Sequence, residues 1–349
     1  MNSIALKICI PISLFSLLLF ALSSCASSPT STKVATPGFY HWKSQLQLSP
    51  SEQNALTQLA IQKLYIKFFD ISTSPRAPFT FTPKTKIDWT SIPPQCTITP
   101  VVYLTIDCLR QLPEESLPQL AQQLLQSIKT LLEGRPLQHL QIDCDWTTKT
   151  REPYFQLLRL LQAQEPNLQL STTIRLHQIK YRQAAGIPPV SKGLLMPYNL
   201  SDPTAYRAQN SIFDSKEAAK YLQNQSLYPL PLDIALPLFS WGIWFRDRQF
   251  RGFVRGLDGA EIAGASYLEP IKPPFFQVIK DTVIQQQYIR MGDEIKLEAV
   301  GVEALREALA FSLPILPNDS FDLLFFHLDE QVLKTYPYEQ LQALCNLEL

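Results

Sequence analysis

Short apolar segments recur along this chain with helical patterns between them, and this alternation limits the possible folds more than any other feature. Eight segments have the length and near-continuous apolar character of parallel strands that are covered on both faces. They lie at residues 38–43, 64–70, 98–105, 137–145, 168–177, 193–199, 232–240 and 321–328. Eight strands alternating with helices predict an α/β fold, a (β/α)8 TIM barrel.

The helical segments between these strands have recognisable ends. Ser49-Pro-Ser-Glu52 is a capping box with proline at the first helical position. Helices are also predicted at residues 115–133, 151–164, 302–311 and 338–344, and Asp214 is expected to cap another. The stretch 241–319 is too long for one crossover, so we predict an insertion at about 242–319, between strands seven and eight. A doubly wound open sheet is the competing fold, but no glycine-rich phosphate loop follows the first strand.

The N-terminus has the pattern of an export signal. Lys7 precedes an apolar run that ends in Leu22-Ser-Ser-Cys25, which predicts a secretory signal peptide at residues 1–24. This ending resembles the bacterial lipobox, which implies that Cys25 is lipidated and anchors the protein to a membrane. An ordinary signal peptide that contains a cysteine is the alternative. Residues 25–36 are predicted to be a flexible tether. Ser27 stands where some inner-membrane lipoproteins carry Asp, so we expect the outer membrane of the cell envelope.

Composition narrows the possible partners. The 31 basic and 31 acidic residues give zero net charge, and no basic block indicates a nucleic-acid partner. The remaining residues 37–349 fit one barrel domain, which we expect to be a monomer. Cysteines and histidines lack metal-ligand spacing, and we expect neither a metal nor a cofactor. The 19 Phe, 13 Tyr and 5 Trp suit a large core and a sugar-stacking surface.

Polar and aromatic side chains follow nearly every predicted strand. Asp143 and Asp145 have the same strand parity, so they point the same way. In a (β/α)8 barrel, function collects at the carboxyl ends of the strands. Acids and flat rings together are what a sugar site needs. The candidate site residues are Asp70, Asp107, Asp143, Asp145, Trp146, Arg175, His177, Tyr198, Asn199 and Trp241.

Two of these strands resemble those of family-18 glycoside hydrolases, the chitinase-like barrels. Ile142-Asp-Cys-Asp-Trp146 looks like that family's catalytic strand, and Leu195-Met-Pro-Tyr-Asn199 looks like its Met-x-Tyr-Asp strand. The resemblance implies that Asp145 orients a substrate N-acetyl group, with Asp143 supporting it, and that Tyr198 binds the reacting sugar. The family's general acid, a Glu, is replaced by Thr147, and its sixth-strand Asp by Asn199.

The whole chain also resembles an uncharacterised family of secreted bacterial lipoproteins, through phrases such as Thr173-Ile-Arg-Leu-His177. Three functional hypotheses stay open. A structural surface lipoprotein with no small ligand would require the strand-end groups to pair with one another. A divergent glycoside hydrolase would use Asp145 with an acid from another strand, such as Asp70 or Asp107. A non-catalytic glycan-binding or assembly lipoprotein is favoured by Thr147.

A structural interpretation accompanies each candidate residue. Arg175 could pair with Asp143 as a structural salt bridge. Asp70 and Asp107 could cap helices. Core packing is the default for any single Trp, including Trp146.

Overall fold

The computed structural model describes residues 33–82, 84–255, 257, 262 and 264–349 of the 349-residue chain. Cys25, the predicted signal peptide and most of the predicted tether lie outside the described residues. Residues 33–349 form one compact unit. Within the part of the chain that is described, no helix is both long and apolar enough to span a bilayer.

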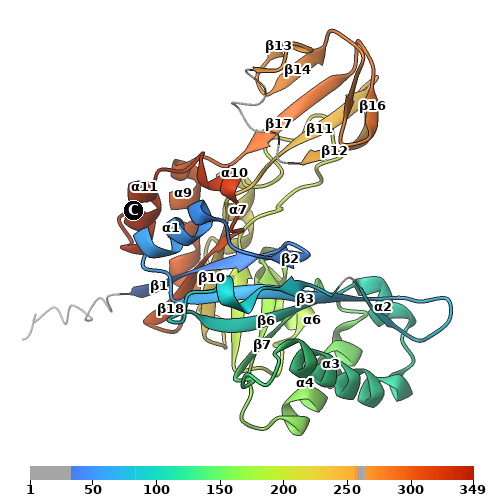
Figure 1. The fold of residues 1–349 in the computed structure, drawn as a ribbon, viewed down its shortest axis with the longest axis vertical. Coiled ribbons are helices and arrows are strands. Elements are labelled where there is room, and N and C mark those ends of the chain that lie inside the picture. The colour runs from blue at the N-terminus through green and yellow to red at the C-terminus, as the bar shows by residue number, and fades with distance from the viewer. Residues whose placement is uncertain (1–32, 83, 256, 258–261, 263) are drawn as a thin grey trace, which may run out of the picture. The chain divides into compact units, whose positions relative to one another are not determined.

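Eight parallel strands close into a barrel, which confirms the predicted fold (Figure 1). Each predicted strand is present, with its ends shifted by a few residues. The ring closes because β1 pairs with β3 as well as with β18. In spatial order the strands are β1 (Val34–His41), β18 (Ser320–Phe326), β10 (Leu232–Pro237), β9 (Lys192–Met196), β8 (Gln169–Arg175), β7 (His139–Asp143), β6 (Thr97–Leu104) and β3 (Lys63–Ser72).

The first strand begins earlier than predicted. Val34 and the two residues after it pair with Ser320 and its neighbours on β18, so they belong to the barrel and not to a flexible tether. Two short pairings flank the ring. β4 (Thr80–Thr82) is antiparallel to β3, and β2 (Gln45–Leu46) pairs with β5 (Lys86–Ile87).

The helices begin where the capping signals predicted. Ser49 caps α1 with the full capping box, and Asp214 accepts a hydrogen bond from the Glu217 backbone at the start of α7. β8 ends at Arg175, two residues earlier than predicted, and the helix after it starts at Leu176, where the Arg175 backbone N–H donates to the Gln178 side-chain oxygen at 2.8 Å. The helices are α1 (Pro50–Gln58), α2 (Ile106–Gln111), α3 (Leu117–Leu131), α4 (Arg151–Gln164), α5 (Leu176–Lys180), α6 (Arg182–Ala185), α7 (Ser215–Leu222), α9 (Val302–Ser312), α10 (Glu330–Leu333) and α11 (Tyr338–Cys345).

The insertion between the seventh and eighth strands is an antiparallel sheet with its own apolar core. Its strands occur in the order β12-β11-β17-β14-β13, and a β15–β16 hairpin accompanies them. The sheet occupies residues 240–299, and α9 then returns along the barrel. The bounds are β11 (Ser240–Arg246), β12 (Gln249–Arg255), β13 (Leu268–Lys272), β14 (Phe275–Val278), β15 (Thr282–Ile284), β16 (Gln287–Ile289) and β17 (Glu294–Ala299).

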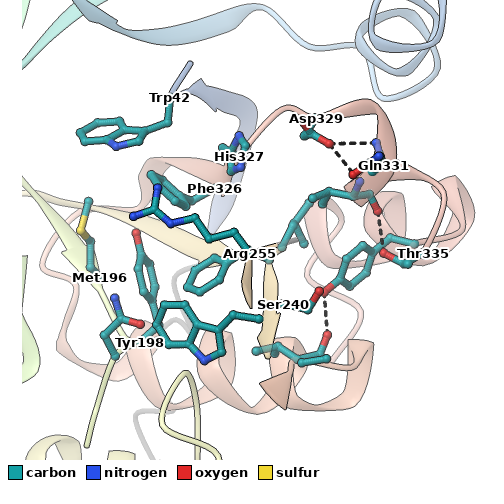
Figure 2. A pocket seen from close by; sticks show the side chains of 18 of the residues that line it. Trp42, Met196, Tyr198, Ser240, Arg255, Phe326, His327, Asp329, Gln331 and Thr335 are labelled. Atoms are coloured by element: carbon teal, nitrogen blue, oxygen red, sulfur yellow. Dashed lines mark hydrogen bonds between the residues drawn. The ribbon is translucent and has the colours of Figure 1, made fainter. Parts of the chain in front are cut away.

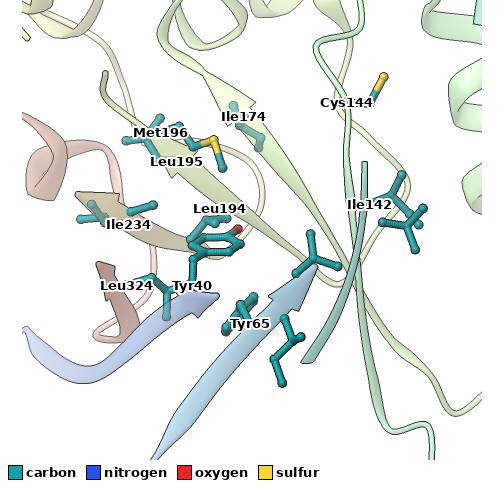
Figure 3. Packing of buried hydrophobic residues seen from close by; sticks show 14 of the residues in the cluster. Tyr40, Tyr65, Ile142, Cys144, Ile174, Leu194, Leu195, Met196, Ile234 and Leu324 are labelled. Carbon is teal, nitrogen blue, oxygen red and sulfur yellow. The ribbon is translucent and has the colours of Figure 1, made fainter. Parts of the chain in front are cut away.

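The barrel interior is filled by side chains rather than open. Figure 3 shows Tyr40, Tyr65, Leu194 and Leu324 gathered inside the ring of strands, and all four are buried. Near the amino ends of the strands, the Lys192 ammonium lies 2.9 Å from an Asp322 carboxylate oxygen and also pairs with Asp233. This buried ionic cluster fills the barrel at the amino ends of the strands. Only the carboxyl ends of the strands therefore remain available for a site.

Candidate functional site

A pocket of about 970 Å³ lies at the carboxyl ends of the barrel strands, where a site was predicted. Side chains from the barrel and from the inserted sheet line it, and Figure 2 shows this mixture of rings and polar groups. It contains seven of the predicted site residues, namely Asp70, Asp143, Asp145, Arg175, Tyr198, Asn199 and Trp241. These residues are therefore brought together from five segments of the sequence.

Three predicted site residues lie outside this pocket. Trp146 is fully buried in the core, where its ring stacks on Tyr154 with centroids 5.3 Å apart and its indole N–H donates to the Ala185 carbonyl. Asp107 is exposed on α2 and pairs with Arg110. His177 is exposed on α5, because the chain leaves β8 one residue after Arg175. Strand parity places Trp146 on the face opposite to Asp143 and Asp145, and Asp107 and His177 lie beyond the ends of β6 and β8, so these three leave the candidate site.

Asp143 is the last residue of β7 and is only 6% exposed. Its Oδ1 accepts a hydrogen bond of 2.7 Å from the Thr173 hydroxyl on the neighbouring strand. Burial raises the pKa of this carboxyl to about 6, although the positive charge of Arg175 acts in the opposite direction. Asp143 is thus a lining acid whose pKa is raised by burial.

Asp145 lies two residues further on and is half-exposed to the pocket. The Arg175 Nε donates to its Oδ1 at 2.7 Å. The salt bridge therefore forms with Asp145 and not with Asp143, the partner that a structural role predicted. The Arg175 guanidinium also lies 5.6 Å from the centroid of the Tyr198 ring. Asp145, Arg175 and Tyr198 form one contiguous polar cluster at the carboxyl ends of three strands.

Lys67 and Asp70 form a second ion pair, with Nζ 3.0 Å from Oδ1. Residues three apart in a regular strand face opposite sides. Both side chains line the pocket because the pairing of β3 with β6 shifts register between Lys67 and Phe69, which leaves Phe68 as an extra residue. The Lys67 ammonium is also 5.3 Å from the centroid of the Trp42 ring. No signal in the sequence marked the bulge.

Aromatic rings make up much of the remaining wall. Trp42 packs against Phe326 with centroids 5.5 Å apart, and Phe326 contacts the ring of Tyr198 at 6.1 Å. Phe239 connects Tyr198 to Trp241, at 6.1 and 5.2 Å respectively. Trp42 and Phe326 are lining residues that the sequence-based set omitted. Both lie at or next to a strand end, so a stricter use of the strand-end rule would have found them.

The two positions that depart from the chitinase-like pattern have local roles. Thr147 lies outside the pocket, and its backbone N–H donates to the Thr150 hydroxyl at the start of α4. Asn199 lines the pocket in a left-handed conformation, φ +57°, and its backbone N–H donates to the Ile212 carbonyl. No group of three His, Cys, Asp or Glu in the described ranges could hold a metal ion.

No protein-family model and no curated protein matches the chain. Among solved structures, it is similar to the spore cortex-lytic enzyme SleL of Bacillus megaterium, with 12% identity, TM-score 0.51, and coverage of 92% of this chain and 75% of that chain. It is also similar to the chitinase RmChi1 of Rhizomucor miehei, with 9% identity, TM-score 0.52, and coverage of 90% and 100%. The chain therefore has the glycoside-hydrolase-like (β/α)8 barrel of chitinase-like proteins.

Proposed function

We propose that this chain is an exported, lipid-anchored protein of the bacterial cell envelope that binds a carbohydrate in the pocket at its strand ends. The observation that carries the proposal is the pocket wall itself. Trp42, Phe239 and Trp241 offer flat rings beside the acids and the arginine of the barrel mouth. Rings that stack on sugar faces, with a few polar groups placed to bind hydroxyls, characterise such sites. The printed names of the fold neighbours, a chitinase and a cortex-lytic enzyme, agree with a glycan ligand.

Binding without cleavage is the form of this function that the site favours. Three lining carboxylates already accept from a cation: Asp70 from Lys67, Asp145 from Arg175, and Asp329 from Lys43 at 2.8 Å. Carboxylates paired in this way accept hydrogen bonds and have no proton to give to a leaving group. The position of the family's general acid is Thr147, which cannot act as an acid near neutral pH.

Hydrolysis is the second candidate, and Asp143 is the observation in its favour. A carboxyl with a pKa of about 6 keeps part of its protons near neutral pH, as a general acid must. Its side chain is nevertheless 6% exposed and already accepts from Thr173. It would have to reach the glycosidic oxygen from the bottom of the pocket.

The test is a glycan panel measured for both affinity and turnover. Trp42→Ala should weaken binding of the best ligand by about 2 kcal/mol, or about 30-fold, as expected when a Trp at the centre of a binding site is truncated. Trp89→Ala is the matched control, because Trp89 is half-buried outside the pocket, against Arg135.

Three outcomes separate the candidates. Binding without new reducing ends supports the proposal. Turnover that disappears in Asp143→Asn would instead establish a hydrolase. A panel in which no glycan binds would remove the carbohydrate function altogether.

A further inference from the structure

The inserted sheet contributes one cation to the pocket, Arg255, and its charge has no carboxylate partner among the described residues. The other two lining cations, Lys67 and Arg175, each pair with an acid of the barrel. Figure 2 shows the Arg255 side chain extending into the pocket, on the side of Trp42 and Tyr198. Among the residues that the structure describes, Arg255 is therefore the positive charge on the insertion side of the site that no carboxylate neutralises.

The backbone of Arg255 is held in place independently of its side chain. Its N–H donates to the Gln285 side-chain oxygen at 3.1 Å, and its carbonyl accepts from the Gln285 amide nitrogen at 2.6 Å. Gln285 lies in the turn between β15 and β16, in a left-handed conformation. The hairpin thus holds the end of β12 through the backbone of Arg255. The guanidinium of Arg255 therefore remains available to bind a ligand.

Arg255 lies directly opposite Trp241 in the antiparallel pairing of β11 with β12. Residues in such a pair project from the same face of the sheet, and both line the pocket. The Trp241 indole N–H donates to Glu298 at 3.0 Å, which orients the ring. The insertion therefore presents an oriented flat ring and a cation as neighbours.

A second guanidinium in the same pocket has spare donors. Arginine carries five N–H groups, and Arg175 uses one side-chain N–H, on Nε, to bind Asp145. Its Nη1 has no partner among the described residues. Arg175 therefore keeps an unused donor in the buried wall of the pocket, while Asp145 pairs with its charge.

We propose that the carbohydrate bound by this pocket is an acidic sugar, whose carboxylate is received by Arg255 while its ring lies against Trp241. The proposal rests on the carbohydrate-binding function proposed above. The planar fork of a guanidinium matches a carboxylate in two parallel hydrogen bonds, a geometry that a neutral sugar hydroxyl cannot use. Of the lining acids, Asp70 and Asp145 are each paired with one cation, and Asp329 shares Lys43 with Glu52. Asp143, the fourth, is only 6% exposed and accepts from Thr173.

The experiment uses the full chain in detergent micelles and calorimetric titration with matched pairs of glycans. One pair is a hyaluronan tetrasaccharide and its carboxyl-reduced form. The other is a disaccharide containing N-acetylmuramic acid and its carboxyl-reduced form. A neutral chitin tetrasaccharide tests carbohydrate binding by itself. At least one acidic glycan should bind about 10-fold to 100-fold more tightly than its reduced counterpart, as expected for hydrogen bonds to a charged group.

Arg255→Met should abolish this preference, and Arg255→Lys should keep part of it. Arg251→Met is the matched control, since Arg251 is an exposed arginine on the same strand and does not line the pocket. The Arg255 side chain is exposed as well, so its replacement should leave the fold intact.

The outcomes distinguish this inference from the function on which it rests. Equal affinity for acidic and reduced glycans overturns the acidic-sugar inference and leaves carbohydrate binding standing. If the chitin tetrasaccharide binds and neither acidic glycan does, the acidic-sugar inference is likewise overturned and carbohydrate binding stands. A preference that survives in Arg255→Met also overturns the inference. If no glycan binds, the proposed function fails, and the inference fails with it.

Discussion

Glu298 connects the inserted sheet to the barrel, and its removal should lower the free energy of unfolding substantially. The side chain is 1% exposed, and its Oε2 accepts from the Ser211 backbone at 3.1 Å, from the Ser211 hydroxyl and from Trp241 at 3.0 Å. The Lys296 ammonium, also 1% exposed, lies 2.6 Å from its other oxygen. Ser211 belongs to the segment between β9 and α7, so one carboxylate joins the barrel to the strand that carries Trp241.

The size of this loss is set by the Lys296 charge, which Glu298→Ala leaves without a counter-ion. Lys296 keeps two bonds of 2.6 Å, to the carbonyls of Ala208 and Gln209, but loses its counter-ion in a buried place. Removing one member of a buried ion pair costs about 3–5 kcal/mol, mostly because the other charge stays buried. We expect about 3 kcal/mol here, since the carbonyl bonds remain. Replacing both charges, in Lys296→Met/Glu298→Gln, should cost less than Glu298→Ala alone.

Urea unfolding followed by tryptophan fluorescence and by circular dichroism measures this loss. Glu269→Ala is the control, because Glu269 is exposed on β13 of the same sheet and should change stability by less than about 0.5 kcal/mol. The reasoning is refuted if Glu298→Ala costs less than about 1 kcal/mol. It is refuted equally if the double variant is less stable than Glu298→Ala.

Two further predictions concern the buried acid and the N-terminus. The folded-state pKa of Asp143, about 6, lies above its ordinary value of 3.8. The folded state therefore holds the proton more tightly, and stability should fall as pH rises from about 4 to 6, by about 3 kcal/mol, a slope that Asp143→Asn removes. Unfolding free energies at pH 4 to 7 test this, and identical pH profiles for the two proteins would contradict it. Cys25→Ser should shift the protein from the membrane fraction to the soluble fraction and abolish fatty-acid labelling, while Ser28→Ala changes neither; an unchanged membrane fraction would argue against the anchor.

The sequence alone determined the barrel and most of the site. Eight apolar strand segments separated by capped helices permit few packings, because strands buried on both faces need helices on the outside. Once the strands are placed, their carboxyl ends must meet at one mouth, and this rule brought Asp143, Asp145, Arg175 and Tyr198 together. Those residues lie in or beside strands, where the position of a residue in the sequence pattern determines where its side chain lies in the barrel.

The tertiary structure decided the positions of residues for which the local sequence pattern does not determine the position in space. Past the end of β8 the period of two no longer applies, so His177 lies exposed on α5 instead of in the pocket beside Arg175. A bulge in β3 brings Lys67 and Asp70 to one face. Arg255 reaches the mouth only through the pairing of β12 with β11 and the grip of Gln285. Bulges, strand ends and contacts between distant segments depend on the packing of the whole chain, so no local pattern encodes them.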